Sequence, residues 1–96
     1  IAKPAEQTSL IAAFACKLMH QAGIPPASLQ LLPGSGAVVG AALSADSRIA
    51  GICFTGSTAT AMHINRNMAR HLPAQAPLIA ETGGLNAMIV DSTALP

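Results

Sequence analysis

Three short segments hold the residues of this 96-residue chain whose types and spacing could do chemistry. KPAE at 3–6 pairs a lysine with a glutamate, FTGS at 54–57 ends in a serine, and ETGG at 81–84 begins with a glutamate. A carboxylate accepts hydrogen bonds from a ribose diol, and an ammonium group donates them. A serine at a helix start, beside free N–H groups, suits an anion. Glu81, next to two glycines that let a substrate approach, could act as a general base.

Each segment also has a purely structural explanation. The charges of KPAE could be solvated at a helix start, Ser57 could be an ordinary N-cap, and Glu81 could begin a surface loop. The segment GSGAVVG at 34–40 has the spacing G-x-G-x-x-x-G, which differs from the dinucleotide fingerprint G-x-G-x-x-G. Close packing of a helix on a sheet explains those glycines equally well. Taken singly, the segments leave both explanations open.

The hydrophobic pattern between the segments predicts alternating helices and strands. Helices are expected within 8–22, 34–46 and 57–72, and strands within 1–3, 29–32, 47–54, 78–81 and 86–91. Thr8 or Ser9 is expected to cap the first helix, and Gly23 to end it. This order predicts an α/β, Rossmann-like fold with an incomplete parallel sheet and helices on both faces. Ligands of such sheets bind at the carboxyl ends of the strands, where KPAE, FTGS and ETGG fall.

The composition indicates a chain whose surface is covered by other protein. Hydrophobic residues make up 51%, charged residues 9%, and mean hydropathy is +0.49, whereas about a quarter of a typical soluble domain is charged. We therefore expect part of a larger protein, packed against the rest of its parent chain. The longest apolar stretch, GAVVGAAL, is too short for a membrane span.

Nucleic acid and metal ions are not expected as partners. A net charge of +1 and 2% aromatic residues supply neither a basic patch nor a stacking platform. The three histidines share no metal-ligand spacing with Cys16 or Cys53. Both cysteines lie within apolar patterns and are expected to be small buried hydrophobes in a reducing compartment.

In their order along the chain, KPAEQT, the PGSG turn, FTGST and ETGG resemble the NAD-binding domain of the aldehyde dehydrogenase superfamily. The resemblance covers essentially the whole chain. The stretch ETGGLNAMIVDSTALP is similar to the glutamate-semialdehyde (pyrroline-5-carboxylate) dehydrogenase branch, which Thr82 supports because most of the superfamily has leucine there. Leu85 departs from the lysine or glutamine common at its position, so no polar role is expected of it.

The resemblance implies a set of residues that contact NAD: Lys3, Glu6, Gly34, Gly36, Gly40, Gly56, Ser57, Thr82 and Gly83. Lys3 and Glu6 would hold the hydroxyls of the adenosine ribose, and the carboxylate would repel the 2′-phosphate of NADP. The glycines of GSGAVVG would line the adenosine side. Ser57, helped by the glycine before it, would meet the pyrophosphate. Thr82 and Gly83 would border the nicotinamide.

For Glu81 the resemblance implies the general base that activates water to hydrolyse a thioester. The nucleophilic cysteine of the family follows the ETGG segment on the catalytic domain, so neither Cys16 nor Cys53 is assigned that role. We expect residues 1–96 to be a segment of the NAD-binding domain, inactive alone. The parent would be an NAD-dependent enzyme that oxidises glutamate γ-semialdehyde to glutamate. FAD is expected only in another domain, if the parent is a bifunctional proline-oxidising protein.

Two alternatives remain open from the sequence. One is an aldehyde dehydrogenase for another semialdehyde, and the other is a non-catalytic nucleotide-binding or structural module. For the parent we expect a cytoplasmic bacterial homo-oligomer that binds NAD and a small aldehyde, with peripheral association to a membrane as an option.

Overall fold

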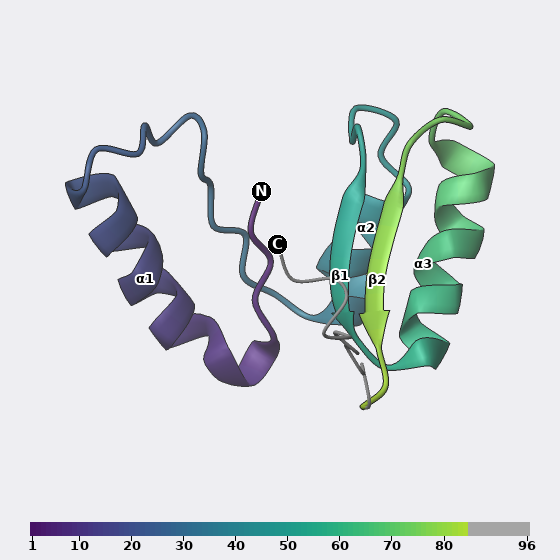
Figure 1. Cartoon of the computed structure of the whole chain (residues 1–96), viewed down its shortest axis with the longest axis horizontal. Coiled ribbons are helices and arrows are strands. Elements are labelled where there is room, and N and C mark those ends of the chain that lie inside the picture. Colours follow the sequence, from purple (N-terminus) through teal and green to yellow (C-terminus); the bar gives the residue numbers. More distant parts are fainter. Residues whose placement is uncertain (85–96) are drawn as a thin grey trace, which may run out of the picture.

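The computed structural model describes residues 1–84, which form three helical segments and a two-stranded sheet (Figure 1). A 3-10 turn at Glu6–Thr8 leads into α1 (Ser9–Gln21). A π-helical turn at Gly36–Gly40 continues into α2 (Ala41–Ser44). The remaining elements are β1 (Ile52–Gly56), α3 (Thr58–His71) and β2 (Leu78–Thr82). The predicted strand at 86–91 lies outside the described residues.

The sheet is parallel, as the sequence predicts. Its register runs from Ile52 opposite Leu78 to Gly56 opposite Thr82. Helix α3 connects the two strands and contacts both of them, and it also contacts α2. The α/β class with a parallel sheet is therefore confirmed. Because the strands run the same way, their carboxyl ends lie side by side.

The N-terminal segment pairs with a different part of the chain. Ala2 forms a parallel bridge with Leu31, in which the Ala2 N–H donates to the Gln30 carbonyl at 2.8 Å and the Leu32 N–H donates to the Ala2 carbonyl at 2.9 Å. The strands expected within 1–3 and 29–32 are thus a single bridge. Helix α1 lies beside this bridged segment and away from β1 and β2 (Figure 1).

The start of α1 differs from the expected cap. The Thr8 hydroxyl donates to the Ala5 carbonyl at 3.1 Å, and the Ser9 hydroxyl donates to the Glu6 carbonyl at 3.1 Å. Neither hydroxyl accepts from a first-turn N–H, so the capping prediction is wrong. The 3-10 turn before the helix supplies carbonyls within reach, and short hydroxyl side chains readily bond back to them. At the other end Gly23, with φ of 101°, follows the helix as predicted.

The core of the described residues is small and centres on α3. Its buried members are Ser44 of α2, Ala61 and Met68 of α3, and Leu72 directly after α3. Ser44 is 1% exposed; its hydroxyl donates to the Ala41 carbonyl at 3.0 Å and accepts from the Asn67 amide at 3.1 Å. This contact joins the two helices and satisfies a polar group that burial alone would disfavour.

Large apolar side chains of α1 remain exposed. Leu10 is 90% exposed and Phe14 is 56% exposed. They lie on the face that the helical spacing predicts to be apolar. Among the described residues, no helix is both long enough and apolar enough to cross a membrane.

Candidate functional site

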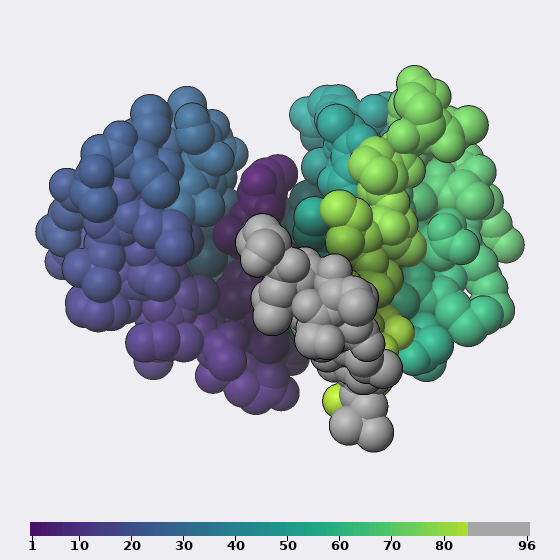
Figure 2. All heavy atoms as spheres, in the orientation of Figure 1, coloured from purple at the N-terminus to yellow at the C-terminus, as the bar shows by residue number. Residues whose placement is uncertain are grey.

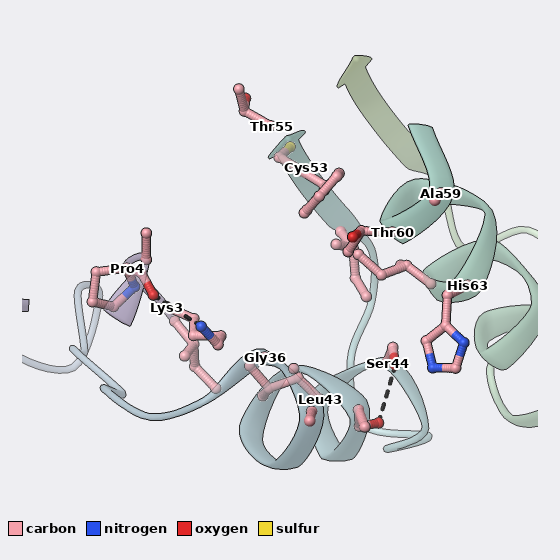
Figure 3. Close-up of a pocket in the computed structure, with 18 of the residues that line it drawn as sticks. Lys3, Pro4, Gly36, Leu43, Ser44, Cys53, Thr55, Ala59, Thr60 and His63 are labelled. Carbon is pink, nitrogen blue, oxygen red and sulfur yellow. Dashed lines mark hydrogen bonds between the residues drawn. The ribbon is translucent and has the colours of Figure 1, made fainter. Parts of the chain in front are cut away.

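A cleft of about 880 Å³ lies between the N-terminal segment, the helix that starts at Gly36, strand β1 and the first turns of α3 (Figure 3). Lys3 and Gly36 border it on one side, and Cys53, Thr55 and Thr60 border it on the other (Figure 3). In Figure 2 the N-terminal segment, in purple, lies between the α1 side of the molecule and the β1–β2 side. The cleft therefore brings together segments that are far apart in the sequence.

Three of the predicted site residues line this cleft: Lys3, Gly36 and Gly40. Two more are directly connected to its lining. Glu6 is hydrogen bonded to Gly36, and Ser57 is hydrogen bonded to Thr60. The other predicted residues are not part of the lining: Gly34, Gly56, Glu81, Thr82 and Gly83. The structure thus brings part of the predicted set to one cleft, and Gly34 and Gly56, which were expected at the adenosine and the pyrophosphate, are not part of it.

Lys3 and Glu6 have separate hydrogen-bond partners. The Lys3 ammonium donates to the Pro4 carbonyl at 2.9 Å, and the Glu6 carboxylate accepts from the Gly36 N–H at 3.1 Å. An ion pair joins Asp46 to Arg48, whose guanidinium holds the pKa of that carboxyl well below its usual range. An ammonium has three donors, and a carboxylate has about four acceptor positions. Both groups of KPAE therefore keep capacity for a further partner.

Ser57 serves as the N-cap of α3. Its hydroxyl oxygen accepts from the Thr60 N–H at 3.2 Å and lies 2.9 Å from the Thr60 hydroxyl. The interpretation of Ser57 as an N-cap is therefore correct. The start of α3 can still bind an anion, because a helix start leaves several N–H groups without helical partners, and these attract anions.

The glycines of GSGAVVG differ in what surrounds them. A Cβ added at Gly34 would lie 2.4 Å from Cγ2 of Val39, so crowding within the segment accounts for that glycine. A Cβ at Gly36 would meet nothing within 4 Å, and one at Gly40 would lie 3.8 Å from Cε of Lys3, an ordinary contact. Packing in the described residues thus accounts for Gly34 and leaves Gly36 and Gly40 facing the cleft.

Two glycines at the ends of the strands, Gly56 and Gly83, are explained by their immediate surroundings. A Cβ at Gly56 would lie 2.6 Å from the ring of Phe54. Gly83 has φ of 71°, a left-handed conformation that favours glycine. Glu81 is exposed and lies opposite Thr55 in the sheet, which puts it at the carboxyl edge where the sequence predicts it.

The two cysteines are less buried than expected. Cys53 is exposed on β1 and lines the cleft, and Cys16 is half-buried on α1. The prediction of two buried cysteines is therefore wrong for Cys53, because the described residues cover β1 incompletely. No group of three metal-ligating side chains occurs within the described part of the chain.

Several polar side chains that line the cleft were not predicted from the sequence, among them Thr55, Thr60 and His63. Thr60 and His63 follow Ser57 at successive intervals of three, which puts side chains on one face of a helix. That spacing can be seen in the sequence. The position of Thr55 at the cleft cannot be predicted from the sequence, because it depends on which strands pair with each other.

The family model for aldehyde dehydrogenases matches residues 1–94, and the chain belongs to the aldehyde dehydrogenase family. Members of this family use NAD or NADP. The chain is 60% identical over 98 residues to the bifunctional protein PutA of Salmonella typhimurium, a match that covers 99% of this chain and 7% of the relative.

Two solved structures are similar as well. A crystal structure of a mutant of proline utilization A (PutA) from Bradyrhizobium japonicum has a TM-score of 0.82 and 56% identity, over 96% of this chain and 9% of that one. A structure of the Delta-pyrroline-5-carboxylate dehydrogenase from Mycobacterium tuberculosis has a TM-score of 0.74 and 38% identity, over 85% of this chain and 16% of that one. The chain thus spans less than a fifth of the length of these relatives.

Proposed function

We propose that this chain is a segment of the NAD-binding domain of an enzyme that oxidises L-glutamate γ-semialdehyde to L-glutamate in proline catabolism. The observation that carries the proposal is that Lys3 and Gly36 line one side of a single cleft and that Glu6 is hydrogen bonded to Gly36. Identity of 60% to PutA supports the choice of substrate, together with the similarity to a Delta-pyrroline-5-carboxylate dehydrogenase.

The residues at the N-terminal end of the cleft fit the adenosine ribose of NAD. The Lys3 ammonium can donate to one hydroxyl while the Glu6 carboxylate accepts from the diol. Gly36 leaves room beside them, since a Cβ there would meet no protein atom. A carboxylate at this point disfavours the 2′-phosphate of NADP by charge repulsion.

The start of α3 fits the pyrophosphate. Ser57 lies directly after β1, and Thr55 and Thr60 on either side of it line the same cleft. The dipole of a helix of 14 residues favours negative charge at this end. Gly34, Gly40 and Gly56 would allow close approach along the adenosine and pyrophosphate.

Glu81 would be the general base of the hydrolytic step, with Thr82 and Gly83 bordering the nicotinamide. When bound, NAD supplies the hydride acceptor for oxidation of the aldehyde. A nucleophilic cysteine of the catalytic domain would hold the acyl group as a thioester, and Glu81 would take a proton from the water that attacks it. In a bifunctional parent, FAD would belong to another domain. A cytoplasmic homo-oligomer, packed around this segment, is the assembly we propose.

The test uses the full-length protein that contains these residues. With L-glutamate γ-semialdehyde as substrate, we expect NADH formation with NAD and much slower turnover with NADP. In Glu81→Gln, the first NADH per active site should form quickly and later turnovers should slow by about 100-fold or more, since general bases typically contribute 10²–10⁴-fold. Rapid-mixing measurements of NADH absorbance separate the two phases.

Asp46→Asn is the matched control, because it removes a carboxylate that is paired with Arg48 and is not part of the cleft lining. It should turn over like the wild type. Full steady-state turnover by Glu81→Gln would overturn the general-base role. Oxidation of another aldehyde in preference to the semialdehyde would overturn the substrate. An absence of NAD binding would leave the non-catalytic module as the correct alternative.

A further inference from the structure

One hydrogen bond joins the two ends of the proposed ribose site. The Gly36 N–H donates to Oε1 of Glu6 at 3.1 Å, across 30 residues of sequence. Glu6 begins the 3-10 turn before α1, and Gly36 begins the helical segment 36–44. The bond therefore links the KPAE and PGSG segments to each other as well as to the proposed site.

The geometry of the helix start explains why this N–H is available. The first N–H groups of a helix have no partners within the helix. The Ser35 side chain already serves one of them, since its oxygen accepts from the Val38 N–H at 3.2 Å. The Gly36 N–H points instead to the Glu6 carboxylate, whose negative charge suits the positive end of a helix dipole.

The bond restricts a side chain that would otherwise move freely. Glu6 is exposed, and an exposed glutamate loses rotamer freedom when it is ordered by a ligand. With Oε1 held by Gly36, the other oxygen and the remaining lone pair are left for the ribose hydroxyls. Part of the entropy that the Glu6 side chain loses on binding the diol is therefore already lost before the cofactor binds.

We propose that the backbone N–H of Gly36 is a positioning group, which holds the Glu6 carboxylate at the ribose diol and thereby strengthens the preference for NAD over NADP. This inference rests on the proposed function. Gly36 acts through Glu6, so the loss of its N–H should act at the 2′-hydroxyl end of the cofactor. A carboxylate released from Gly36 can turn away, which weakens its contact with NAD and its repulsion of NADP alike.

Gly36→Pro removes the N–H, and Gly36→Ala keeps it while adding a Cβ at the same point. Proline is well tolerated at the first position of a helix. The preceding residue, Ser35, has φ of −66° and ψ of 147°, which is the extended conformation that a following proline requires. A Cβ at Gly36 meets no protein atom within 4 Å, so alanine controls for the added Cβ. The two variants then differ in the N–H and in the proline ring carbon that replaces its hydrogen.

We expect calorimetry on the full-length protein to show NAD binding about tenfold weaker in Gly36→Pro than in Gly36→Ala, the size typical of one hydrogen bond to a charged group. The ratio of NAD to NADP affinity should fall in Gly36→Pro by a similar factor. The same pair of variants is then compared in a Glu6→Ala background. There the difference between proline and alanine should vanish, because the N–H no longer has a carboxylate to hold.

A second measurement reads the contact without any change at Gly36. Hydrogen exchange of the peptide that contains this residue should gain one fast amide in Glu6→Ala relative to the wild type. Equal NAD affinity and NAD-to-NADP ratio in the two Gly36 variants would overturn the inference and leave the proposed function intact. A difference that persists in the Glu6→Ala background, or unchanged exchange, would also overturn it. Failure of the wild type to bind NAD would instead overturn the proposed function.

Discussion

At the residue scale, Ser57 has a structural role and a proposed binding role that substitution can separate. Its oxygen caps α3 by accepting from the Thr60 N–H. Aspartate and asparagine cap helices as well as serine does, but aspartate adds a negative charge where the pyrophosphate is expected. We predict that Ser57→Asp and Ser57→Asn unfold at similar temperatures, and that Ser57→Asp binds NAD at least tenfold more weakly.

Thermal unfolding and calorimetry of the full-length variants measure the two quantities separately. Ser57→Ala serves as the control for the cap, and its α3 should lose about 1 kcal/mol of stability. Equal NAD affinity in the aspartate and asparagine variants would place the pyrophosphate elsewhere.

Single residues were predictable where their chemistry is local. The position of Gly23 after α1 and the capping of α3 by Ser57 follow from rules that span a few residues. The capping rule failed for Thr8 and Ser9, because their hydroxyls donate to backbone carbonyls at the 3-10 turn. The exposure of Cys53 could not be predicted, since it depends on which elements cover β1.

At the element scale, the contact between α2 and α3 depends on a polar pair within a small core. Ser44 is buried and accepts from Asn67, and the two residues are 23 positions apart. We predict that Asn67→Ala destabilises this helix pair by about 1 kcal/mol, the net worth of one hydrogen bond, and that Ser44→Ala costs up to about 3 kcal/mol because it also removes the donor to Ala41.

Hydrogen exchange of the α2 and α3 amides in the full-length protein measures these costs. The double variant should cost less than the sum of the singles, because the two side chains share one bond. Additive costs would contradict the contact. Neither residue stood out in the sequence, since Ser44 lies in a small-residue segment and Asn67 in a polar one.

The elements themselves were predicted well where periodicity is strong. The expected helices correspond to α1, the segment 36–44 and α3, and two expected strands correspond to β1 and β2. The apolar run LQLL forms only the bridge at Leu31. A run of this length becomes a strand only if a partner pairs with it, and the pattern does not reveal how long that partner is.

At the scale of the whole molecule, the described chain is open. Its radius of gyration is 16.3 Å, whereas a compact domain of about 100 residues has about 13 Å. Helix α1 and the bridged N-terminal segment lie apart from β1, β2 and α3 (Figure 1). The low charge content of the sequence agrees with the exposed apolar side chains of α1, because both indicate surface that other protein covers.

The convergence of Lys3, Glu6, Gly36 and the start of α3 on one cleft is the central claim, and it concerns distant segments rather than any one motif. The position of NAD in a crystal structure of the full-length protein tests it most directly. We predict that the adenosine ribose lies within hydrogen-bond distance of Lys3 and Glu6, beside Gly36, and that the pyrophosphate lies at the N-terminus of α3. An NAD molecule bound elsewhere, with these residues free of contact, would contradict the claim.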